Sequence, residues 1–66
     1  MNFCNINFTT VEDGMKELKA AVDRRNRCCG DLYWEVFNDD AAEIAVKIIR
    51  LGGNESEVGN ELSRRH

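Results

Sequence analysis

The 66-residue chain contains no proline and a single histidine, and its three cysteines are an odd number. The absence of proline, together with an apolar fraction of 42%, argues against a disordered chain. An odd cysteine count makes a poor disulfide framework. Long hydrophobic runs are also missing, since "EIAVKIIRL" is too short and too charged to cross a bilayer. These absences predict a small folded domain without disulfides or a membrane span.

The first residues, "MNFCNINF", lack the basic and apolar regions of a secretory signal peptide. We therefore expect a cytoplasmic protein, in a compartment where thiols stay reduced. The net charge of −3 disfavours binding to the nucleic-acid backbone, which requires a basic surface. An acidic chain fits a protein partner with a basic surface instead.

The length allows one domain, residues 1–66, with one thin core. A domain of this size buries only about 60% of its unfolded surface and often needs support from a disulfide, a metal or a partner subunit.

The first half of the chain changes its hydrophobic period once. Residues 2–8, "NFCNINF", alternate between apolar and polar positions, which is typical of a strand. From residue 11 the apolar residues follow a helical spacing instead, and Thr9 with Glu12 forms a capping box. The buried stripe of this helix is predicted to contain Val11, Met15, Leu18 and Val22.

The second half repeats the order of strand and helix. The segment "DLYWEVF", residues 31–37, predicts a strand with Leu32, Trp34 and Val36 on its core side. Residues 38–40 offer caps for a second helix, "DAAEIAVKIIRL", which Gly52 and Gly53 end. Its apolar stripe is predicted to contain Ala41, Ile44, Ala45, Ile48 and Ile49. Asn54 or Ser56 begins a last short helix with Val58 and Leu62 one turn apart.

This order predicts an α+β fold, a βαβα mini-domain in which a two-stranded sheet packs on two helices plus a short C-terminal helix. A two-stranded sheet is rarely stable alone, so we expect a homodimer to complete it. The alternative is a small helical bundle in which the first predicted strand is irregular.

The adjacent pair Cys28 and Cys29 follows three arginines. One interpretation is a reactive thiol activated by the arginines, or a metal site formed with Cys4 and His66. Adjacent cysteines, however, point to opposite sides of an extended chain, whereas metal ligands usually lie two to four residues apart. We favour small buried filler at the start of a strand, and predict no metal and no cofactor.

Three carboxylates, Asp39, Asp40 and Glu43, cluster at the expected start of the second helix. They could bind a divalent cation or exchange protons. Acidic residues in a first helical turn are also what capping and the helix dipole require. No nucleophile motif or glycine-rich loop accompanies them, and we predict no catalytic residue and no enzyme activity.

The segment "IIRLGGNESEVGNEL" resembles the first part of a helix-turn-helix of the Fis-like type over about fifteen residues. In that family a basic helix reads DNA. Here the second helix carries Glu55, Glu57 and Glu61 instead, which disfavours nucleic acid as a ligand.

The aromatic residues Tyr33, Phe37 and Phe3 fall on the strand faces opposite the predicted core sides. Aromatic side chains are enriched at interface hot spots, so this face is the candidate contact patch. The competing interpretation is that the final helix folds back and covers it. The predicted partner-binding set is Tyr33, Glu35, Phe37, Phe3, Asp39, Asp40 and Glu43.

The sequence thus predicts a small acidic protein-binding module, an adaptor or inhibitor of a larger protein machine. Small acidic proteins that phages and mobile elements direct against host systems share this size and charge. A helix-turn-helix-like DNA-binding regulator and a thiol redox or metal-binding protein acting through Cys28 and Cys29 are the alternatives.

Overall fold

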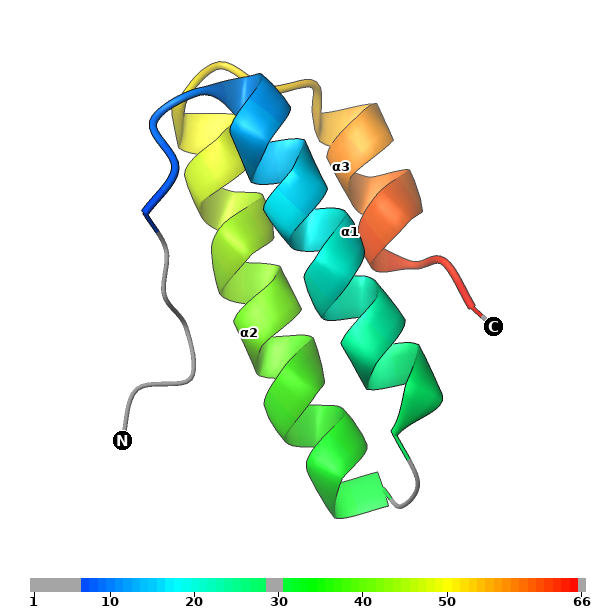
Figure 1. Cartoon of the computed structure of the whole chain (residues 1–66). Coiled ribbons are helices and arrows are strands. Elements are labelled where there is room, and N and C mark those ends of the chain that lie inside the picture. The colour runs from blue at the N-terminus through cyan, green and yellow to red at the C-terminus, as the bar shows by residue number, and fades with distance from the viewer. Residues whose placement is uncertain (1–6, 29–30, 66) are drawn as a thin grey trace.

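The computed structural model describes residues 7–28 and 31–65, which form three helices: α1 (Val11–Arg27), α2 (Asp31–Arg50) and α3 (Glu55–Leu62). Helices α1 and α2 form a long antiparallel hairpin (Figure 1). The shorter α3 lies beside the part of the hairpin near the α2–α3 turn. The described residues therefore form a small three-helix bundle.

The α+β prediction is wrong, because neither described range contains a strand. Of the first predicted strand, residues 2–6 lie outside the described residues, and Asn7 and Phe8 belong to no regular element. The second predicted strand, 31–37, is the beginning of α2. The helical bundle given as the alternative is the observed architecture, and the reason for expecting a homodimer, a sheet that needs completing, no longer holds.

Helix α2 is continuous because nothing between residues 31 and 50 breaks it: this stretch has no glycine or proline. Residues Trp34, Asn38, Ala41, Ala45 and Ile48 follow one another at steps of four and three, so they share one face. Asn38, Asp39 and Asp40 are weak helix formers, each costing about 0.7 kcal/mol relative to alanine, and they do not stop a helix that packs well.

Helix α1 begins one residue later than its predicted cap. Thr10, and not Thr9, is the N-cap, and its hydroxyl accepts a hydrogen bond from the Asp13 backbone N–H at 3.2 Å. The predicted stripe is confirmed, since Leu18 and Val22 are fully buried and Val11 and Met15 pack against the core.

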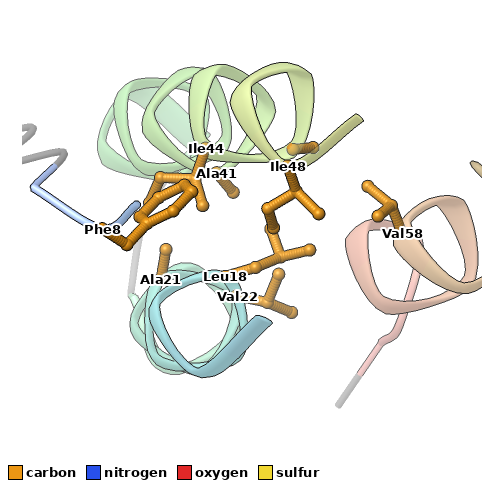
Figure 2. Close-up of a cluster of buried hydrophobic side chains, with 9 residues drawn as sticks. Phe8, Leu18, Ala21, Val22, Ala41, Ile44, Ile48 and Val58 are labelled. Atoms are coloured by element: carbon orange, nitrogen blue, oxygen red, sulfur yellow. The ribbon is translucent and has the colours of Figure 1, made fainter. Parts of the chain in front are cut away.

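The core fills the space between α1 and α2 and reaches α3 through a single valine (Figure 2). Its buried apolar members are Phe8, Leu18, Ala21, Val22, Ala41, Ile44, Ala45, Ile48 and Val58. Four of the five residues predicted for the second helix stripe are buried, whereas Ile49 is 38% exposed. Phe8, which precedes α1, lies on the side of the core away from Val58 (Figure 2), and its ring packs beside Gly14 in the first turn of α1.

The turn between α2 and α3 depends on glycine. Gly52 has φ of +100°, which other residues rarely adopt, and its N–H bonds the Ile49 carbonyl oxygen at 3.0 Å. The Gly53 N–H then bonds the Ile48 carbonyl oxygen at 2.9 Å. Asn54 caps α3 by accepting from the Glu57 N–H at 3.0 Å, and Val58 points into the core (Figure 2). The glycine turn and the short helix after it are as the sequence predicts, and the turn places α3 against the hairpin.

Candidate interaction surface on helix α2

One side of α2 gathers most of the predicted partner-binding residues. Tyr33, Val36, Phe37, Asp40 and Glu43 are spaced three or four residues apart, which places them on one side of the helix. We call these five residues the α2 outer face. Tyr33 is 66% exposed and Val36 39% exposed, Glu43 is exposed, and Phe37 and Asp40 are half-buried.

Three predicted residues do not join this face. Glu35 and Asp39 are exposed, but the helical spacing turns them toward another side of α2. Phe3 lies outside the described residues. Val36 enters the set in their place, although a strand would have placed it on the core side with Trp34.

The carboxylates on α2 do not cap the helix, contrary to one interpretation of the sequence. Helix α2 begins at Asp31, so Asp39, Asp40 and Glu43 lie well inside it. Capping and the helix dipole act only in the first turn and cannot account for these three residues. Aspartate is a weak helix former, so Asp39 and Asp40 each lower the stability of the helix.

The surroundings of Asp40 add to this cost. Partial burial raises the pKa of the Asp40 carboxyl above its ordinary value, and the neighbouring charges of Glu43 and Asp39 raise it further. Arg24 on α1 acts in the opposite direction. The raised pKa means that the ionised form of Asp40 is less stable in the folded chain than in the unfolded chain.

The acidic residues also set the charge distribution of the molecule. Between residues 31 and 46 there are five acidic and no basic side chains, a local charge of −5. The whole chain has a net charge of −3, so the remainder carries +2. The negative charge is therefore concentrated in the part of α2 that also bears the exposed Tyr33, whereas the last turn of the helix carries the basic Lys47 and Arg50.

Helix α3 does not cover Tyr33 of the α2 outer face. Its fully buried side chain, Val58, points toward Ile48 and the α1 residues Leu18 and Val22 (Figure 2). The 66% exposure of Tyr33 shows directly that the final helix leaves this ring accessible.

The sequence interpretation did not single out Arg25 as a structural residue. Arginines in the last turn of a helix usually face water, and we expected the same of Arg25. It is only 3% exposed, and its guanidinium carbon lies 5.0 Å from the centroid of the Trp34 ring. All five of its N–H groups are used. Nε and Nη2 each donate to Asn26 Oδ1 at 3.1 Å. Nη1 donates to Asn38 Oδ1 at 2.8 Å and to the Leu62 carbonyl oxygen at 2.7 Å. Nη2 also donates to the Arg64 carbonyl oxygen at 2.7 Å.

Arg25 thus joins α1 to α2 and to the end of α3, and it supplies the partner that the inward Asn38 requires. Burial lowers the pKa of Arg25 below its ordinary value, and the charges of Arg65 and Arg64 lower it further. One sequence signal could have found it: Arg25 continues the spacing of Leu18, Ala21 and Val22 on the buried face of α1.

The fold gives little support to the interpretation of the cysteines as a reactive thiol or as part of a metal site. Cys28 is a half-buried free thiol that follows α1 as its C-cap, and no strand begins there. Cys4, Cys29 and His66 lie outside the described residues. Within 7–28 and 31–65, no three or more histidine, cysteine or acidic side chains are placed to hold a metal ion.

The segment that resembles a helix-turn-helix does form two helices with a glycine turn between them. Its second helix, α3, has Glu55 and Glu57 in its first turn and no basic residue in its last. This charge is the reverse of that of a DNA-reading helix.

Comparison with known proteins gives no relationship: no family model, no curated protein and no solved structure matches this chain. None of the helices in the described ranges has the length and apolar character needed to cross a membrane.

Proposed function

We propose that this chain is an intracellular protein-binding module whose contact surface is the α2 outer face. The observation that carries the proposal is the position of Tyr33 and Val36, exposed beside Asp40 and Glu43 on one helix face. An apolar centre with charged residues beside it is the usual organisation of a protein interface. Tyrosine is among the residues that contribute most to binding there.

The partner in this proposal presents a basic surface with an apolar pocket for Tyr33. The carboxylates of Asp40 and Glu43 on this face attract such a surface and speed association. Asp40 and Glu43 lie inside the helix and do not cap it, and partial burial together with the charge of Glu43 raises the pKa of the Asp40 carboxyl, which disfavours its ionised form in the folded chain. Residues that lower the stability of the fold are expected at functional sites. A short chain with one such face suits an adaptor or an inhibitor of a larger protein.

Site-directed photocrosslinking in the source cell tests the proposal. A benzoylphenylalanine at position 33 should give one discrete protein adduct, and the same substitution at Glu57, on the exposed surface of α3, should give none. Reversing charge with Asp40→Lys and Glu43→Lys should reduce the adduct at position 33 by at least about tenfold, since like charges then oppose the partner.

Two controls accompany this experiment. Glu55→Lys with Glu57→Lys changes net charge equally on α3, so it should leave the adduct at position 33 unchanged. Circular dichroism of each variant verifies that it folds. Equal labelling from positions 33 and 57, or an adduct insensitive to charge reversal on α2, would contradict the proposal.

A further inference from the structure

A hollow of about 380 Å³ lies where the end of α3 meets α1 and α2. Its lining residues are Arg25, Trp34, Asn38, Leu62, Ser63 and Arg65. The volume is within the range of small-molecule sites and well above that of a single oxyanion. This hollow is separate from the α2 outer face, with which it shares no residue.

The charge beside this hollow is positive, and no carboxylate of residues 7–28 and 31–65 forms an ion pair with Arg25 or Arg65. The buried Arg25 guanidinium bonds only neutral amide and carbonyl oxygens. No salt bridge joins Arg25 or Arg65 to another side chain of the described residues. Asp23 and Glu61, which could have balanced this charge, are both bonded to Arg64. A buried positive charge with neutral partners favours a nearby anion.

The lining also supplies hydrogen-bond donors. The Trp34 indole N–H, the Ser63 hydroxyl and the Arg65 guanidinium all belong to lining residues, and none of them bonds a residue within the described ranges. The carbonyl oxygens of Leu62 and Arg64, which would repel an anion at the end of α3, are already bonded to Arg25. Donors without protein acceptors and engaged carbonyls together suit an oxyanion.

We propose that this hollow is a binding site for an oxyanion of the phosphate type. Arg65 and Ser63 contact the anion, with the Trp34 indole as a further donor. Arg25 does not bind it directly, because all five of its N–H groups are occupied, and contributes its positive field. Trp34 and Leu62 give the hollow apolar walls, which can accept the organic part of a phosphate ester.

The fluorescence of Trp34 tests this site, because it is the only tryptophan in the chain. Sodium phosphate should produce a saturable change in Trp34 emission, whereas sodium chloride at the same ionic strength should not. Phosphate should also raise the melting temperature, since it binds the folded chain. Phenyl phosphate, excited at wavelengths where only tryptophan absorbs, separates the two sources of the ligand: tighter binding than phosphate indicates an ester, and equal binding a free anion.

Two arginine variants make the test specific. Arg65→Gln removes an exposed lining residue that bonds nothing else described, so the chain should fold while phosphate affinity falls at least about tenfold. Arg27→Gln removes an equal charge outside the hollow and should leave the affinity unchanged. Identical responses to phosphate and chloride, or equal affinity in Arg65→Gln and the unchanged protein, would overturn the proposal.

Discussion

At the scale of single residues, two glycines in helices have opposite surroundings. A Cβ at Gly14 would lie 2.6 Å from Phe8 Cε2 and 2.7 Å from Ile48 Cγ1. A Cβ at Gly59 would meet nothing within 4 Å. The missing side chain at Gly14 is therefore a packing requirement, whereas at Gly59 it only lowers helix stability.

The same substitution should consequently have opposite effects at the two sites. Gly14→Ala should destabilise the protein by about 1–3 kcal/mol, because overpacking outweighs the gain in helix propensity. Gly59→Ala should stabilise it by about 0.5–1 kcal/mol. Urea unfolding measures both, and a stabilising Gly14→Ala would show that Phe8 does not pack on α1 as described.

Arg25 is a further position at which the surroundings determine how much a substitution changes the stability of the protein. Arg25→Met should lower the free energy of unfolding by about 2 kcal/mol or more, since the Leu62 and Arg64 carbonyls and the Asn38 amide lose their donor. Arg24→Met, at the exposed neighbouring position, should stay within about 0.5 kcal/mol. Equal stability of the two variants in thermal unfolding would count against the hydrogen-bond network around Arg25.

Two aspartates should respond to pH with opposite sign. The folded-state pKa of Asp40 is raised, so its charge destabilises the folded chain above the ordinary value of 3.8, and Asp40→Asn should be stabilising at pH 7. The hydrogen bond from Arg64 lowers the pKa of Asp23, so its contribution is present above 3.8 and is lost as pH falls through the folded-state value. Asp23→Asn should therefore be destabilising at pH 7.

Melting temperatures of the two aspartate variants from pH 7 to 2 check this sign. Both differences from the unchanged protein should shrink in acid, where the carboxyls are protonated in the folded and unfolded states alike. If both substitutions changed the melting temperature at pH 7 in the same direction, the environments described for the two aspartates would be wrong. If the proposed function is correct, Asp40→Asn also weakens partner binding while it stabilises the fold.

At the scale of elements, α3 is the helix with the smallest apolar anchor. Val58 is its one residue in the buried core, with Leu62 partly buried beside it. Polar contacts provide the rest of the attachment of α3 to α1. Arg25 donates to the Leu62 and Arg64 carbonyl oxygens, and the Asn26 amide donates to the Arg64 carbonyl oxygen at 3.0 Å. Arg64 also forms a salt bridge with Asp23. A helix of eight residues is marginal alone, so α3 depends on these tertiary contacts.

Two valine substitutions compare this anchor with an exposed position. Val58→Ala should destabilise the protein by about 1–3 kcal/mol, because it removes a side chain that is 2% exposed. Val46→Ala, at a position 49% exposed on α2, should have an effect within about 0.5 kcal/mol. Hydrogen exchange of the α3 amides should accelerate in the first variant alone, and unchanged protection there would show that the polar contacts suffice.

At the scale of the whole molecule, the sequence predicted the three segments with helical spacing and most of the core. Leu18, Val22, Ile44 and Ile48 were identified from their spacing alone, and Gly52 and Asn54 from their turn chemistry. Such local signals work because capping, left-handed glycine and amphipathic periodicity depend on neighbours in the chain. The net charge of −3 follows from composition alone.

Only the tertiary structure determined the secondary structure of residues 31–40. Trp34, Asn38 and Ala41 continue one helical face, but the alternation of residues 32–37 favoured a strand, and the polar residues 38–40 after it favoured a helix cap. Arg25, distant in sequence, satisfies the Asn38 amide and stacks on Trp34, so the helix continues through this point. The sequence by itself determined where the chain is amphipathic and where it turns. The burial of Arg25, the uninterrupted α2 and the exposed face of Tyr33 required the packed bundle, because each depends on contacts between residues far apart in the chain.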